Sequence, residues 1–185
     1  MSSPIRIGAT MYVLAAALVL ALLTLLFSDA IDRRRNPNRS PISVSASDGA
    51  KSIVLRRNRA GHYVVNGRVN GHTAEFLLDT GATAVSVSKS FAKQAGLRKG
   101  PQGQAVTANG ITTAYATSID SLVIGEIEEQ NVAASIVPAL AGEQVLLGMS
   151  FLKRLDFAQR DDILILTQRY LGPLDPNRKQ LPRGE

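Results

Sequence analysis

Residues 75–88 read "EFLLDTGATAVSVS", and this stretch decides how the rest of the chain is interpreted. An apolar run leads into Asp79, and an alternating run follows the glycine at position 81. An ionised carboxylate at the end of an apolar strand is costly unless it is paired or hydrogen-bonded. The stretch therefore predicts a strand, a tight loop that carries Asp79, and a second strand that resumes at residue 84.

Signals of β structure surround this stretch on both sides. Asn70-Gly71 separates two β-rich runs, and Asn109-Gly110 lies between two Thr-rich arms. Asn-Gly is the strongest short-range signal of a hairpin, because a type I′ turn needs positive φ at both central residues. The sequence therefore predicts two hairpins, one before the Asp79 loop and one after it.

The remaining segments of this domain are short. "SFAKQAGL" at residues 90–97 predicts a short helix, and "EQVLLGMSFLKRL" at 143–155 predicts an apolar strand, a glycine and another short helix. "DDILILTQ" at 161–168 predicts a final strand, with Asp161 and Asp162 in a solvated turn. We place one domain at residues 52–170 and expect the Pro- and charge-rich residues 171–185 to be a disordered tail.

The first thirty residues have a different character. No charged residue occurs from 7 to 28, which exceeds the roughly 18 apolar residues that indicate a membrane-spanning helix. A cleaved signal peptide is the alternative, because small residues stand at Ser28 and Ala30. The apolar run is longer than the roughly 7–15 residues of a signal sequence. We therefore expect an uncleaved transmembrane anchor over residues 1–30.

A basic, Ser- and Pro-rich segment follows the apolar run. Residues 31–51 are expected to form a flexible linker. The formal net charge of +6 is concentrated in and just after this segment, at Arg33, Arg34, Arg35, Arg39, Lys51, Arg56, Arg57 and Arg59. Such clustering beside an apolar span favours contact with anionic lipid. Nucleic-acid binding is not expected, because no aromatic residues are interleaved with the basic ones.

Several kinds of chemistry are excluded or disfavoured. The chain has no cysteine, which excludes disulfides and thiol nucleophiles. His62 and His72 lack the spacing of a metal-binding pair, so no metal and no cofactor are expected. No Gly-x-Ser-x-Gly motif of serine hydrolases occurs.

Three segments together resemble the retropepsin-like aspartic proteases, and the whole chain resembles their small membrane-anchored bacterial members. "FLLDTGATAVSVS" is similar to the active-site loop of that family, and "VLLGMSFLKRLDF" to its second signature, a hydrophobic pair and a glycine leading into a helix. The Asn109-Gly110 hairpin lies between them, where the family has its flap. The resemblance covers roughly residues 63–167 and implies an all-β fold, a closed barrel forming half of an acid protease, with one short helix.

The resemblance also implies roles for individual residues. Asp79 would be the catalytic carboxylate, supported in its loop by Thr80, Gly81 and Ala82. Asn109 and Gly110 would form the flap tip over an extended protein or peptide substrate, and Gly148 would lie in the psi-shaped loop behind Asp79. Asp79-Thr80-Gly81 could instead be a simple turn with an Asx hydrogen bond.

The implied activity is peptide hydrolysis by two aspartates, yet the chain contains one Asp-Thr-Gly. We therefore expect a homodimer in which Asp79 of two subunits forms the dyad, with the "ILIL" segment at 163–166 pairing across the two-fold axis. The alternative is a peptide-binding or assembly module of the same fold without turnover.

The expected location is the inner (plasma) membrane, crossed once. The arginines after the span favour a cytoplasmic domain by the positive-inside rule. An N-terminal signal-anchor, in contrast, commonly delivers its domain to the outer face. We expect the catalytic domain to be extracytoplasmic, and the sequence leaves the side open.

Overall fold

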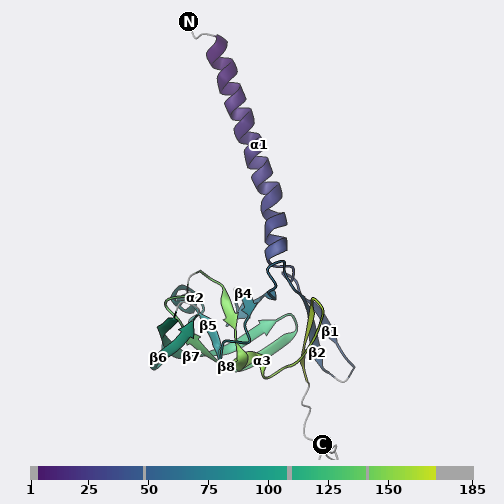
Figure 1. Cartoon of the computed structure of the whole chain (residues 1–185), viewed down its shortest axis with the longest axis vertical. Coiled ribbons are helices and arrows are strands. Elements are labelled where there is room, and N and C mark those ends of the chain that lie inside the picture. The colour runs from purple at the N-terminus through teal and green to yellow at the C-terminus, as the bar shows by residue number, and fades with distance from the viewer. Residues whose placement is uncertain (1–3, 48, 108–109, 141, 170–185) are drawn as a thin grey trace, which may run out of the picture.

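The structure is a computed structural model that describes residues 4–47, 49–107, 110–140 and 142–169. The expected disordered tail at 171–185 lies outside these residues, as does Asn109 of the expected flap tip. Figure 1 shows one long helix standing clear of a β-rich body. The elements in order are α1 (Pro4–Arg35), β1 (Ile42–Ser45), β2 (Lys51–Arg56), β3 (Val64–Val69), β4 (His72–Leu78), β5 (Val85–Val87), α2 (Lys89–Gln94), β6 (Gln102–Thr107), β7 (Gly110–Ile124), β8 (Ile127–Ile136), β9 (Val145–Leu147), α3 (Met149–Leu152), β10 (Asp156–Arg160) and β11 (Ile163–Gln168).

Six strands close into a barrel in the order β3-β4-β9-β5-β8-β7, because β7 also pairs with β3. Strand β6 is attached outside this circle as the second arm of the β6–β7 hairpin. Asn70 (φ 49°) and Gly71 (φ 83°) both adopt positive φ at the β3–β4 turn, as a type I′ hairpin requires. The expected all-β closed barrel is confirmed, with two short helices, α2 and α3, where the family resemblance implied one.

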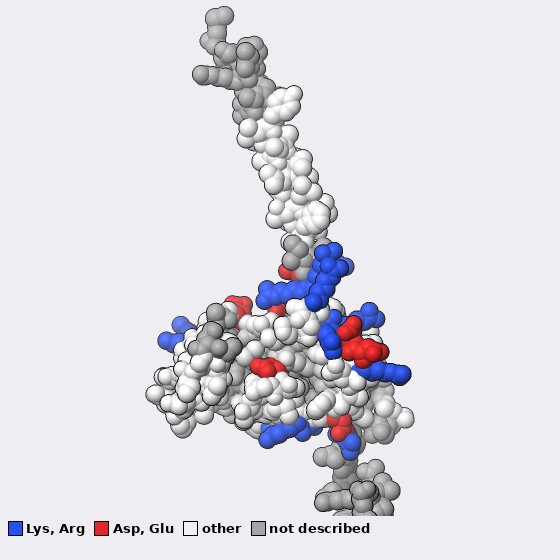
Figure 2. Space-filling view, in the orientation of Figure 1, with Lys and Arg blue, Asp and Glu red and all other residues white. Residues whose placement is uncertain are grey.

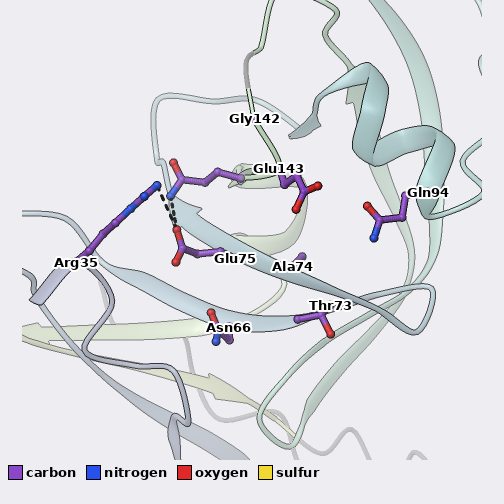
Figure 3. Close-up of a pocket in the computed structure, with 9 residues that line it drawn as sticks. Arg35, Asn66, Thr73, Ala74, Glu75, Gln94, Gly142 and Glu143 are labelled. Carbon is purple, nitrogen blue, oxygen red and sulfur yellow. Dashed lines mark hydrogen bonds and ion pairs between the residues drawn. The ribbon is translucent and has the colours of Figure 1, made fainter. Parts of the chain in front are cut away.

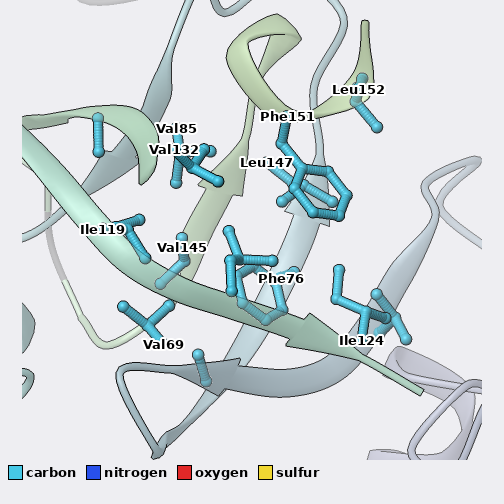
Figure 4. Packing of buried hydrophobic residues seen from close by; sticks show 14 of the residues in the cluster. Val69, Phe76, Val85, Ile119, Ile124, Val132, Val145, Leu147, Phe151 and Leu152 are labelled. Carbon is cyan, nitrogen blue, oxygen red and sulfur yellow. The ribbon is translucent and has the colours of Figure 1, made fainter. Parts of the chain in front are cut away.

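Apolar side chains from the strands and both short helices fill the barrel (Figure 4). Along β4, Ala74 and Phe76 are buried while Glu75 between them is half-buried, which is the two-residue period of a strand. Phe91 of α2 and Phe151 of α3 are also buried. Burial of each such phenylalanine contributes about 1.5–3 kcal/mol, so the helices are held by the same core as the strands.

A second sheet of four strands, in the order β1-β2-β11-β10, lies beside the barrel. Ile53 on β2 and Leu166 on β11 point from this sheet into the common core. Strand β11 is antiparallel to β10 on one side and to β2 on the other. Since a strand has only two hydrogen-bonding edges, the expected pairing of residues 163–166 with a second subunit is wrong. Both edges of β11 are used within one chain.

Helix α1 is long and apolar enough to cross a membrane over Met11–Arg35, by length and composition. It is the one helix of this kind within the described part of the chain. Arg33, Arg34 and Arg35 occupy its last turn, where cations are favourable at the negative end of the helix dipole. Figure 2 shows the resulting concentration of Lys and Arg where the helix meets the body.

Two buried asparagines connect α1 to the barrel, and we call residues 36–38 the joint. Asn38 Nδ2 donates to the carbonyls of Arg56 (2.9 Å) and Val64 (2.7 Å). Asn38 Oδ1 accepts the Arg56 N–H at 2.7 Å. Asn36 Nδ2 donates to Asn66 Oδ1 at 2.8 Å, and Asn36 Oδ1 accepts the Asn38 N–H at 3.0 Å. The joint therefore binds to β2 and β3 through side-chain amides whose polar atoms are paired.

The flexible linker expected over 31–51 is wrong, because this range holds the end of α1, the joint and strand β1. Asn and Pro are typical of turns, which is why the segment predicts a linker. An asparagine amide can also pair with backbone N–H and C=O groups of neighbouring strands. Asn38 does so and is 4% exposed.

Substituting Asn38→Ala is expected to lower the free energy of unfolding by about 1–3 kcal/mol, because buried backbone groups of Arg56 and Val64 lose their partner. The measurement is a urea titration of the full chain in detergent micelles, followed by circular dichroism. Gln104→Ala, an exposed side chain on β6, is the control and should change little. Equal stability of Asn38→Ala and wild type would contradict a structural role for the joint.

Candidate active site

Asp79 lies where β4 ends, at the base of a tight loop. Its N–H donates to the carbonyl of Leu147 on β9 (3.2 Å). Its Oδ1 accepts the Gly81 N–H at 2.9 Å, and its backbone carbonyl accepts the Ala82 N–H at 3.2 Å. The Asx hydrogen bond of the simple-turn interpretation is therefore present. Asp79 is half-buried, so its carboxylate is oriented by the loop and still reachable.

Strand β9 passes between the two strands that flank this loop. It is parallel to β4 through Leu78–Leu147 and antiparallel to β5 through Ser86–Leu146. Gly148 follows β9, and a Cβ placed there would lie 2.3 Å from the Ala84 carbonyl oxygen and 2.7 Å from that of Ala82. These are backbone atoms that cannot swing away, so glycine is required for the close approach. This crossing distinguishes the loop from an ordinary exposed turn.

Helix α3 joins the same loop from its first turn. The N–H groups of Met149 and Ser150 donate to the carbonyls of Ala82 (2.8 Å) and Thr83 (3.0 Å). Ser150 Oγ also accepts the Val85 N–H (2.9 Å) and donates to the Ala133 carbonyl (2.6 Å). The sequence-based site omits Ser150, which ties the loop to β5 and β8. Its position two residues after Gly148 is the only sequence signal that could have indicated it.

The structure brings together Asp79, Thr80, Gly81, Ala82 and Gly148. Thr80 is exposed at the outside of the loop, and a Cβ on Gly81 would lie 3.2 Å from Asp79 Oδ1. Their roles in the reaction stay predictions, because the geometry describes one chain.

The expected flap corresponds to the β6–β7 hairpin. Gly110 pairs with Thr107 at its end, while Asn109 lies outside the described residues. The next pair, Val106 and Ile111, is 85% and 71% exposed. The hairpin therefore presents an apolar pair near its tip, as a surface that meets a ligand would.

A cavity of about 480 Å³ lies away from Asp79, against the end of α1 (Figure 3). At its centre, Glu75 accepts Gln144 Nε2 at 3.0 Å and Asn36 Nδ2 at 3.3 Å. Arg35 approaches the same carboxylate at 3.6 Å. Glu75 thus connects the end of α1, strand β4 and the residue before β9. The pattern "EFLLDTG" alone gives no sign of this contact.

The described residues contain no group of three or more His, Cys, Asp or Glu side chains that could hold a metal ion. His62 and His72 are both exposed. The expectation that no metal or cofactor takes part stays a prediction.

Comparisons with known proteins agree with this geometry. Residues 65–154 match the family described as "gag-polyprotein putative aspartyl protease". A crystal structure of a retropepsin-like aspartic protease from Rickettsia conorii superposes with a TM-score of 0.53 and 28% identity, covering 70% of this chain and 94% of that one.

Two curated relatives are uncharacterised. One, from the 5′ region of cobV in Sinorhizobium sp., is 32% identical over 126 residues, covering 66% of this chain and 54% of the relative. The other, from Rickettsia prowazekii, is 34% identical over 119 residues, covering 62% and 50%. The chain thus spans about half the length of the curated relatives it matches.

The closed barrel, the psi-shaped crossing of β9 and the Asp-Thr-Gly loop define a protein of the aspartic-protease fold. Over this region the chain is similar in sequence and in fold to the retropepsin-like aspartic proteases.

Proposed function

We propose that this protein is a membrane-anchored aspartic endopeptidase whose catalytic dyad is formed by Asp79 from two copies of the chain. The observation that carries the proposal is the Asp79 loop, with its carboxylate hydrogen-bonded to the Gly81 N–H and its backbone held by Gly148 and α3. A barrel needs no half-buried carboxylate at this position. In this loop the Gly81 N–H orients the carboxylate of Asp79.

The proposed chemistry requires two carboxylates that share one proton. Like charges about 3 Å apart do not both ionise, so the pair titrates as a unit; this is the established property of aspartic proteases as a class. The ionised carboxylate takes a proton from a water molecule while the oxygen of that water attacks the peptide carbonyl carbon. The protonated carboxyl group donates its proton to the carbonyl oxygen. When the C–N bond breaks, the departing nitrogen receives the proton that the first carboxylate took from water, and the second carboxyl group regains its own. One Asp79 cannot fill both roles.

The substrate would bind as an extended protein or peptide segment. Pairing of an extended segment with strand edges supplies backbone hydrogen bonds, and side-chain pockets supply selectivity. Val106 and Ile111 near the hairpin tip, with Gly110 and Asn109 at the tip itself, would cover that segment and favour apolar side chains beside the cleaved bond.

The proposed location is the inner (plasma) membrane, with α1 as a single span and the catalytic domain on the extracytoplasmic side. The length and composition of α1 support the span. The arginines in its last turn and Arg39 would meet anionic lipid headgroups.

The inhibitor pepstatin separates this proposal from a peptide-binding module without turnover. We expect pepstatin to raise the melting temperature of the wild-type full chain and to leave that of Asp79→Ala unchanged, because this substitution removes both carboxylates of the proposed dyad. Cleavage of an unfolded protein such as casein should be blocked by the same inhibitor. Equal melting shifts in both proteins, without cleavage, would favour the module.

A further inference from the structure

Glu75 is the one carboxylate of strand β4, the strand that leads directly into Asp79. Its side chain is 31% exposed, and donors from separate parts of the chain converge on it (Figure 3). Gln144 Nε2 donates to Oε1 at 3.0 Å, and Asn36 Nδ2 donates to Oε2 at 3.3 Å. A guanidinium nitrogen of Arg35 lies 3.6 Å from Oε1. Donors on both oxygens hold a carboxylate in one orientation, so Glu75 is a fixed point between these segments.

The contact with Gln144 lies at the start of a short pair of parallel strands. Strands β4 and β9 are paired from Phe76–Val145 to Leu78–Leu147. One step before the first pair, the same register places Glu75 beside Gln144, so their side-chain hydrogen bond extends the pairing by one position. Strand β9 has only three residues, and so short a strand depends on the contacts that hold its two ends.

The opposite end of this strand pair carries the Asp79 loop. The Asp79 N–H donates to the Leu147 carbonyl at 3.2 Å, the long end of the usual range. A change in the spacing of β4 and β9 would therefore move Asp79 relative to the strand behind it. Glu75 precedes Asp79 by about 13 Å of extended chain. It does not touch the reacting atoms and would act through the two strands.

We propose that Glu75 is a positioning residue for Asp79. It keeps β4 and β9 in register through its hydrogen bond from Gln144. Arg35 and Asn36, at the end of α1, orient its carboxylate for that bond. This inference rests on the proposed function, because it gives Glu75 a part in aligning the catalytic carboxylate. One side chain thereby makes the geometry of the Asp79 loop depend on how the end of α1 is seated.

Two substitutions in the full chain in detergent test this role, because each removes one partner of the same hydrogen bond. Glu75→Ala and Gln144→Ala should each lower kcat for a fluorogenic unfolded protein about tenfold, because a misplaced carboxylate slows the reaction. KM should change less than about twofold, because neither side chain touches the substrate. The double variant should lose no more than the stronger single variant, since both act through one contact.

Glu75→Gln is the conservative variant. Two donors approach Oε1 and one approaches Oε2, so the amide oxygen of glutamine should take the place of Oε1 and keep the bond from Gln144. This variant should retain kcat within about threefold of wild type. A contact that only fastened α1 to the barrel would lower stability in all these variants and leave kcat of the folded protein unchanged.

Glu128→Ala is the matched control. Glu128 lies on β8, and its carboxylate accepts the Ser121 hydroxyl at 2.9 Å, so the substitution removes a glutamate and its hydrogen bond away from β4 and β9. Both kcat and KM should equal those of wild type. If Glu75→Ala does not fold, Gln144→Ala and Glu75→Gln carry the same comparison.

Hydrogen exchange, followed by mass spectrometry, measures the loop without relying on peptidase activity. In both alanine variants, peptides covering residues 76–82 should exchange about tenfold faster than in wild type, because the Asp79 N–H loses a firmly placed acceptor on Leu147. Peptides covering residues 112–124 of β7 should exchange as in wild type. Unchanged exchange in β7 excludes a general loss of stability as the cause.

The outcomes separate this inference from the proposed function. If wild type cleaves the substrate and both alanine variants keep its kcat and its loop exchange, Glu75 is not a positioning residue and the endopeptidase proposal stands. A higher KM at constant kcat would also overturn the inference, because it would assign Glu75 to substrate binding. Faster loop exchange in both variants, with a wild type that cleaves nothing, would support the link from Glu75 to Asp79 and contradict the activity.

Discussion

Peptidase activity per wild-type chain is expected to fall to about one quarter when the full-length protein is mixed with about a threefold excess of Asp79→Asn and the subunits exchange freely. Asp79→Asn alone should lose about 1,000-fold or more of the activity, because an amide can neither accept the proton of water nor share one with the opposite carboxylate. A mixed dimer holds one carboxylate and should be inactive. The measurement is cleavage of a fluorogenic unfolded protein at constant wild-type concentration.

The control for this experiment is Asp120→Asn, the same chemical change at an exposed position of β7. In excess, it should leave the activity per wild-type chain unchanged. Exchange of subunits must be followed separately by energy transfer between labelled chains. Constant activity in the presence of exchanged Asp79→Asn would show that each chain acts alone, and the shared dyad would then be the wrong mechanism.

Gly148→Val is expected to cost more than about 3 kcal/mol of unfolding free energy, the largest stability effect we predict for a single substitution. The new side chain would begin 2.3 Å from the Ala84 carbonyl oxygen, and relief of that contact requires β9 and the Asp79 loop to move apart. Peptidase activity should be lost even where part of the protein still folds. Urea titration monitored by circular dichroism measures the change.

Gly148→Ala provides a milder form of this test, because its single methyl meets the same backbone atoms and should also be strongly destabilising. Gly103→Val is the matched control. Gly103 lies in β6, and nothing lies within 4 Å of a Cβ placed there, so valine should fit without loss. Stability of Gly148→Ala equal to wild type would mean that the β9 crossing tolerates a side chain, which the distances contradict.

Those parts of the fold that depend on local pattern could be predicted from the sequence. The β3–β4 hairpin followed from Asn70-Gly71, because the positive φ of two successive residues depends on the identity of those two residues alone. The strand that leads into Asp79 followed from the apolar run before it and from the hairpin signal, and the structure confirms it as β4 (His72–Leu78). The position of Gly148 followed from the family resemblance, and the close backbone carbonyls of Ala82 and Ala84 explain why glycine is needed there.

The failures occur where a residue's partner lies far away in the sequence. Asn38 gives the signal of a turn, and its actual partners are backbone groups 18 and 26 residues further on. Strand β10 gives no signal, because all of its residues are exposed and no buried face imposes an alternating pattern. The apolar residues 163–166 invite an intermolecular interpretation, which fails because β2 and β10 already occupy both edges of β11.

The joint at residues 36–38 has a consequence for where cleavage can occur. A helix of 32 residues is roughly 48 Å long, and the hydrocarbon core of a bilayer is roughly 30 Å thick. Because Asn36 and Asn38 fix α1 to the barrel, the proposed active site would lie at a set distance from the bilayer surface if α1 spans the membrane. A substrate held in the same membrane would be cut at a position measured from the lipid surface as well as by its local sequence. Enzyme and substrate would meet by lateral diffusion in two dimensions. The cleavage site would then be selected both by its distance from the membrane and by its fit to the substrate cleft.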